Sequence, residues 1–178
     1  MWIMVSMYLV LLMHDVGLVT TLTTAITGLS ISFLGFLFVD DTDIVVMGNS
    51  TDTPQTIQGR LQKMITHWNG LLRVTGGALK KEKCYWYLAD FVWINGKCSL
   101  SYKIPEPVHI TNDAGALEAM SYKLPHEATE AVGVWQDLIG SCSKLLEVLL
   151  ANIRAKHLSH AKKPLSRHLC WITLKQAI

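Results

Sequence analysis

The sequence has few charged residues and few cysteines, and both shortages exclude classes of protein. Only 17% of its 178 residues are charged and the formal net charge is +2, which argues against a disordered chain and against a polycationic nucleic-acid binder. Any nucleic acid would have to be bound by a local cluster of cations. The four cysteines form no C-x-x-C pair, so neither a zinc ribbon nor a disulfide-stapled secreted domain is indicated, and reduced thiols are expected.

Basic residues are absent from the first 39 positions, where His14 and Asp15 are the only ionisable side chains. A signal peptide usually opens with a positively charged region, which this sequence lacks. The apolar run 1–13 is too short to span a bilayer, whereas the run 16–39 is long enough. Threonine, serine and glycine interrupt the second run, so two interpretations remain. It is either a membrane segment or, as we favour, a buried helix followed by a buried strand.

Hydrophobic periodicity and turn residues predict a mixture of helices and hairpins. Helices are expected over 2–14, where the helix should be largely buried, from Pro54 to Gly76, over 143–158, and from Pro164 onward. Strands are expected over 32–39 and 44–47 around a turn at 40–43, over 84–88, over 91–94 and 97–102 around Asn95-Gly96, and over 129–136. The remaining long stretch, 104–125, is expected to be mostly loop.

Two adjacent aspartates, Asp40 and Asp41, lie in the predicted turn at 40–43. Neighbouring side chains diverge on a strand, so one carboxylate can face a metal ion while the other supports it from beside. Hard divalent cations prefer such oxygen ligands, and in two-metal catalysis carboxylates hold the ions that activate the attacking hydroxyl and stabilise the leaving oxygen. Aspartate is also a common turn former. A solvated turn is therefore the alternative, and Asp43 is expected to cap that turn.

A short cationic segment follows the second predicted helix. Lys80, Lys81 and Lys83 precede the aromatic run Tyr85-Trp86-Tyr87, and cations beside stacking aromatics are typical of nucleic-acid contacts. A solvated turn that leads into a half-buried strand explains the same residues.

Four short motifs occur in a fixed order along the chain: Phe38-Val39-Asp40-Asp41, Leu79 to Cys84, Phe91 to Lys97, and Val132-Gly133. Together with the long helix that separates the first two, they resemble the second half of a reverse transcriptase domain of the retrotransposon type. The resemblance covers about residues 2–178 and implies an α+β fold. A partial palm, an antiparallel sheet with packed helices, would occupy 1–139, and a truncated helical thumb-like segment would occupy 140–178.

The resemblance also implies roles for particular residues in an RNA-directed DNA polymerase. Asp40 and Asp41 would be catalytic and would bind Mg²⁺ or Mn²⁺, and Lys83 would lie near the incoming nucleotide. Val132-Gly133 would contact the primer, and Lys80 and Lys81 would contact nucleic acid. The implied partners are an RNA template, a DNA primer and deoxynucleoside triphosphates, with no specific protein partner, and the expected location is the cytoplasm or nucleus.

Two parts of the family pattern would lie outside this sequence. The first catalytic aspartate and the Gln-Gly loop of the family would precede Met1, and the thumb would be unfinished at Ile178. Two metal ions need several carboxylate ligands, and the motif supplies only Asp40 and Asp41. We therefore expect no polymerase activity from this chain alone. The alternatives are a catalytically inactive nucleic-acid-binding relic and, less favoured, a small membrane protein anchored by residues 16–39.

Overall fold

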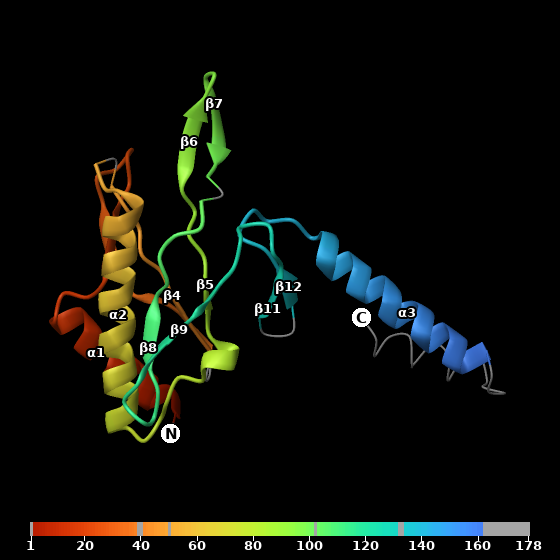
Figure 1. The fold of residues 1–178 in the computed structure, drawn as a ribbon, viewed down its shortest axis with the longest axis horizontal. Helices are drawn as coiled ribbons and strands as arrows, with labels where there is room; N and C mark the ends of the chain where they lie inside the picture. The colour runs from red at the N-terminus through yellow and green to blue at the C-terminus, as the bar shows by residue number, and fades with distance from the viewer. Residues whose placement is uncertain (1, 39–40, 50, 102, 132–133, 162–178) are drawn as a thin grey trace. The chain divides into compact units, whose positions relative to one another are not determined.

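A computed structural model of the protein describes residues 2–38, 41–49, 51–101, 103–131 and 134–161. The chain divides into two compact units, 1–124 and 125–178. The first unit contains α1 (Trp2–Asp15), β1 (Thr20–Thr23), β2 (Ser30–Phe33), β3 (Gly35–Phe38), β4 (Asp41–Ile44), α2 (Pro54–Val74), the 3₁₀ turn η1 (Lys81–Lys83), β5 (Tyr85–Trp86), β6 (Phe91–Ile94), β7 (Lys97–Leu100), β8 (His109–Thr111), β9 (Leu117–Ala119) and β10 (Ser121–Tyr122) (Figure 1). The second contains β11 (Thr129–Ala131), β12 (Val134–Gln136) and α3 (Ser143–Ala161).

The fold is α+β, as expected, but its strands pair only two by two. Five pairs are antiparallel hairpins (β1–β2, β3–β4, β6–β7, β8–β9 and β11–β12), and β5 pairs with β10 in parallel. Within the part of the chain that the structure describes, no sheet has a third strand. The single antiparallel sheet that the resemblance implies is therefore not formed by these residues.

Helix α2 begins and ends where the sequence predicts. The Thr53 hydroxyl accepts a hydrogen bond from the Thr56 amide at 3.2 Å and Pro54 occupies the first turn, which satisfies an amide that would otherwise lack a partner. At the other end Gly76 adopts a φ of 82°, which favours glycine, and the Gly77 amide bonds to the Leu72 carbonyl at 2.9 Å.

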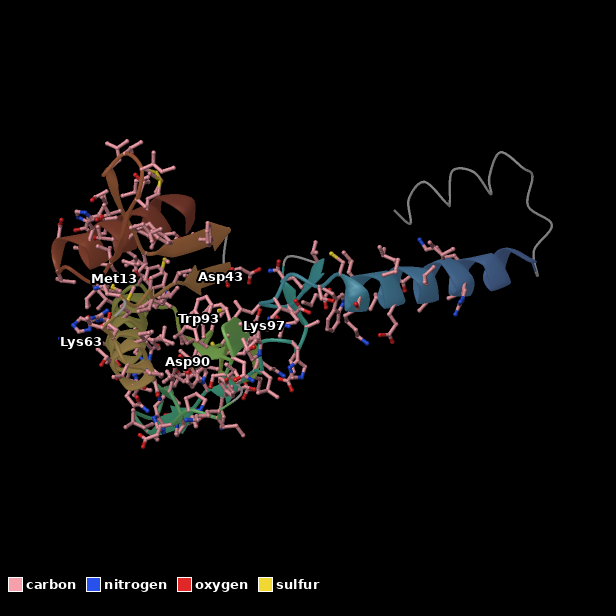
Figure 2. The ribbon with its side chains drawn as sticks, turned by 90° about the horizontal axis from the view of Figure 1, so that it is seen from above. Met13, Asp43, Lys63, Asp90, Trp93 and Lys97 are labelled. Atoms are coloured by element: carbon pink, nitrogen blue, oxygen red, sulfur yellow. The ribbon has the colours of Figure 1, made fainter. Side chains whose placement is uncertain are left out.

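Two hydrophobic cores lie against α2. In the first, Met64, Trp68 and Leu72 of α2 pack with Leu9 and Met13 of α1, and Figure 2 shows Met13 where the two helices meet. The second core consists of Ile65 of α2 with Trp86, Val108 and Ile110. Helix α2 therefore joins the two cores of the first unit.

Strand β8 lies beside helix α2 (Figure 1), and polar side chains of α2 bond to the backbone of β8. The Gln62 amide donates to the His109 carbonyl at 2.8 Å, and its oxygen accepts from the His109 amide at 2.7 Å. The Asn69 amide donates to the Thr111 carbonyl at 2.9 Å, and the Arg73 guanidinium donates to the same carbonyl at 3.1 Å. These side chains satisfy strand backbone groups that a neighbouring strand would otherwise pair.

Helix α1 is buried on one side only, which corrects the expectation of a largely buried helix. Leu9 and Met13 are fully buried. The opposite face exposes large apolar side chains, with exposed fractions between 59% and 77%: Met4, Met7, Tyr8 and Leu11.

The described part of the segment 16–39 contains three short strands, β1, β2 and β3, rather than one helix and one strand. The predicted strand 32–39 is divided at Leu34, which is buried and whose carbonyl accepts from the Val45 amide at 3.0 Å. Its first part, β2, pairs with the unpredicted strand β1. Among the residues that the structure describes, no helix is both long enough and apolar enough to cross a membrane.

Other predictions are confirmed or corrected by the strand pairing. The hairpin around Asn95-Gly96 forms as expected, with both residues at positive φ, 51° and 75°. The region 104–125 is mostly loop, as expected, but it also contains three short strands that were not predicted, β8, β9 and β10.

The second unit contains a hairpin, β11–β12, where a single strand over 129–136 was expected, and α3 confirms the predicted helix at 143. The predicted palm–thumb boundary, between 139 and 140, lies inside this unit. The helix predicted from Pro164 onward falls outside the described residues.

Candidate functional site

The β3–β4 hairpin carries the acidic motif. Phe38 pairs with Asp41 and Phe36 pairs with Asp43, so Asp41 is the first residue of the returning strand rather than part of a longer turn. Alternate residues of a strand share a face, so Asp41 and Asp43 lie on one face and Ile44 on the other. Ile44 packs against both hydrophobic cores, which anchors the hairpin, while Asp41 and Asp43 are exposed.

Asp43 lies on the same face of strand β4 as Asp41, and this shared face was not predicted from the sequence. Although the Asp43 residue is exposed as a whole, partial desolvation of its carboxyl raises its pKa above the ordinary value, and the negative charge of Asp41 raises the pKa further. Asp43 lies within strand β4 rather than in the turn where it was expected. The hairpin therefore presents two interacting carboxyl groups at alternate positions, and both are oxygen donors of the kind that hard cations prefer.

A close backbone approach fixes the position of this hairpin. A Cβ atom on Gly35 would lie 1.7 Å from the Asp43 carbonyl oxygen and 2.8 Å from its carbonyl carbon. Only glycine fits at this position, because the atoms it meets belong to the backbone of the paired strand. The register that places Asp43 opposite Phe36 thus depends on the absence of a side chain at position 35.

The cationic segment forms a compact turn, residues 80–83, which we call the lysine turn. The Lys83 amide bonds to the Lys80 carbonyl at 3.0 Å, and all three lysine side chains are exposed. Lys81 Nζ lies 3.7 Å from Glu118 Oε2. In the described ranges, Lys80 and Lys83 form no ion pair.

The lysine turn and the acidic hairpin are anchored to the same cores. Leu79, which directly precedes Lys80, packs against both cores, as does Ile44 of β4. Cys84 follows the turn and is half-buried; burial raises the pKa of its thiol, and the charge of Glu82 raises it further. This thiol is therefore a poor nucleophile near neutral pH.

The remaining predicted site residues are not placed by the structure. Asp40, Val132 and Gly133 lie outside the described residues. The joint binding of a metal ion by Asp40 and Asp41 and the contact of Val132-Gly133 with a primer therefore stay predictions. Over the described ranges, no group of three or more His, Cys, Asp or Glu side chains could hold a metal ion.

Glu118 was not among the predicted site residues; it lies in β9, within the region predicted to be loop. The turn residues Asn112-Asp113-Ala114-Gly115 between two short apolar segments were the available signal for that hairpin.

A comparison of the chain with protein-family models, with curated proteins and with solved structures finds no match.

Proposed function

We propose that this chain derives from the second half of the palm and the start of the thumb of a retroelement reverse transcriptase, an RNA-directed DNA polymerase. One observation supports the proposal most. Phe38 and Asp41, the first and last residues of the Phe-x-Asp-Asp motif, are paired in a two-stranded hairpin that is anchored, through Ile44, to the same cores as the lysine turn. The order of these motifs along the sequence and their common anchoring in one unit agree with a polymerase site.

In this proposal the residues keep the roles that the resemblance implies. Asp40 and Asp41 bind Mg²⁺ or Mn²⁺, which supplies charge stabilisation for phosphoryl transfer when bound. Lys83 meets the triphosphate of the incoming nucleotide, Lys80 and Lys81 contact the nucleic acid, and Val132-Gly133 contacts the primer. The palm would comprise residues 1–139 and the thumb residues 140–178.

The carboxylates on the hairpin are suited to a divalent cation but are too few for a complete two-ion centre. Asp41 is exposed and Asp43 shares its face. Two adjacent ions require several carboxylate ligands. We therefore propose that the chain by itself binds a primer–template without extending it.

Two assays on the purified full chain test the proposal. In primer extension with Mg²⁺ or Mn²⁺, no incorporation is expected; incorporation that Asp41→Ala abolishes would show that the chain is active alone. In fluorescence anisotropy, binding to a labelled primer–template should weaken as salt increases, because cations on the protein release counterions from phosphates.

The lysine variant and its control make the binding assay specific. Lys80→Gln should weaken binding and lower the salt slope by about 0.9, the value for one lost phosphate contact. Lys63→Gln removes the same charge from α2, where Lys63 is exposed and lies far from the labelled Asp43 in Figure 2, and should leave the slope unchanged. A wild-type chain that fails to bind a primer–template at low salt would refute the proposed function.

A further inference from the structure

The carboxylate of Glu118 is held in place by its own hairpin. The Asn112 side-chain amide donates to Glu118 Oε1 at 2.6 Å, and Asn112 Oδ1 in turn accepts from the Ala116 amide at 2.9 Å. The second carboxylate oxygen, Oε2, lies 3.7 Å from Lys81 Nζ. Because the Glu118 side chain is only 33% exposed, water screens this ion pair less than it screens a pair on an open surface.

The hairpin that carries Glu118 is itself fixed to α2. Gln62 bonds to both backbone groups of His109, and Asn69 and Arg73 bond to the Thr111 carbonyl. β8 is paired with β9 through three residue pairs, one of which joins Ile110 to Glu118. The position of Glu118 is therefore determined by α2 rather than by the lysine turn.

The side of the lysine turn that faces β9 is unfavourable for a phosphate. An open cavity of about 460 Å³ lies there, lined by Lys81, Glu82 and residues 118–121. Its ionisable lining residues are one lysine and two glutamates, so its formal charge is negative. A phosphate group would meet repulsion from Glu82 and Glu118 on this side.

We propose that Glu118 is a positioning residue of the lysine turn: it holds Lys81 against β9 and leaves Lys80 and Lys83 as the lysines that meet phosphate groups, Lys80 on the nucleic acid and Lys83 on the incoming nucleotide. The inference rests on the proposed function, since it assigns the nucleic-acid contacts among the three lysines. It also replaces the role that the resemblance and the proposed function give to Lys81, a direct contact with nucleic acid.

Glu118→Gln tests the inference, because glutamine has nearly the same shape and its oxygen can still accept the hydrogen bond from Asn112. With a short DNA duplex as the probe, the released Lys81 should add one phosphate contact, and the plot of log Kobs against log salt should steepen by about 0.9. Lys81→Gln alone should leave the wild-type slope unchanged. The double variant Glu118→Gln/Lys81→Gln should return to the wild-type slope.

Glu106→Gln is the matched control, because it removes one negative charge from an exposed position of the same unit. It should not change the slope. If Glu118→Gln binds with the wild-type slope while the wild-type chain binds DNA, the inference is wrong and the proposed function stands. An equal increase with Glu106→Gln would also overturn the inference, since net charge would then explain the effect.

A second measurement does not depend on nucleic acid. Under limiting acetic anhydride, mass spectrometry should show slower acetylation of Lys81 than of Lys80 and Lys83 in the wild-type chain. In Glu118→Gln the three rates should become similar. Equal rates in the wild-type chain would overturn the inference, whereas slower acetylation of Lys81 in a chain that binds no DNA would leave Glu118 as its partner and refute the proposed function alone.

Discussion

Substitution of Gly35 by alanine should disrupt the acidic hairpin more than any other single added methyl group that the structure allows us to evaluate. The new Cβ would lie 1.7 Å from the Asp43 carbonyl oxygen and 3.0 Å from the Ile44 Cα. These are backbone atoms of the paired strand, so no side chain can rotate away to relieve the contact. The two strands must separate or change register, which moves Asp41 and Asp43.

The expected loss of stability can be set against known overpacking effects. Extra methylene groups in a packed core typically cost about 1–3 kcal/mol, and a clash between two backbones belongs at or above the upper end of that range. We expect the free energy of unfolding to fall by about 3 kcal/mol. With a typical urea m-value of about 2 kcal/mol/M, the unfolding midpoint should fall by about 1.5 M.

Urea unfolding followed by far-ultraviolet circular dichroism measures this shift, and α2 offers a matched control. A Cβ atom on Gly59 would meet nothing within 4 Å, and alanine is the better helix former, so Gly59→Ala should raise the free energy of unfolding by about 0.5–1 kcal/mol. A Gly35→Ala midpoint within error of the wild-type value would refute the pairing of β3 with β4 described here.

Three further predictions concern charge, hydrogen bonding and thiol reactivity. Asp43→Asn should raise the free energy of unfolding at pH 7 by less than about 1 kcal/mol. The pKa of Asp43 is raised above 3.8 on folding, so the wild-type chain loses stability as pH rises through the folded-state pKa. Below pH 3.8 the carboxyl is neutral in both the folded and the unfolded state, so urea titrations should show no difference between the variant and the wild-type chain. Gln62→Leu should cost about 1–3 kcal/mol in the same urea assay because it removes the partners of both His109 backbone groups; an unchanged midpoint would contradict the attachment of β8 to α2. Cys84 should react with iodoacetamide more slowly than the exposed Cys98, as measured by peptide mass spectrometry; equal rates in the folded chain would contradict its burial.

Local signals in the sequence were sufficient for the elements whose ends are encoded locally. Pro54 predicted the start of α2, and Asn95-Gly96 predicted the turn between β6 and β7, because a preference for the first helical turn and positive φ depend on the residues themselves. The hairpin that carries Asp41 was also predicted, but Asp41 lies in strand β4 rather than in the predicted turn, because the strand begins three residues earlier than the pattern indicated.

The elements that the sequence analysis missed depend on distant partners. Strands β8 and β9 are short, and much of the backbone bonding of β8 comes from Gln62, Asn69 and Arg73 on α2. No local sequence pattern indicates that side chains of a distant helix will bond to the backbone of a strand. β1 was missed because its threonines lie within a nearly continuous apolar segment, where the alternation typical of a half-buried strand is weak. The ion pair of Lys81 with Glu118 also could not be predicted from the sequence, because the two residues are distant along the chain and only the fold brings them together.

The contribution of α2 to both cores has a consequence for how the first unit opens. Detachment of α2 from the two cores would expose its Trp68 and Ile65 to water together, and β8 would lose its hydrogen bonds to α2 at the same time. Its amide hydrogens should therefore exchange with solvent only when the whole unit unfolds. The β6–β7 hairpin differs, because Phe91, Trp93 and Ile94 are each more than half exposed, and it can open and close while α2 remains intact. Brief local opening of this hairpin is thus separated from the slow, cooperative unfolding that would displace the acidic hairpin and the lysine turn.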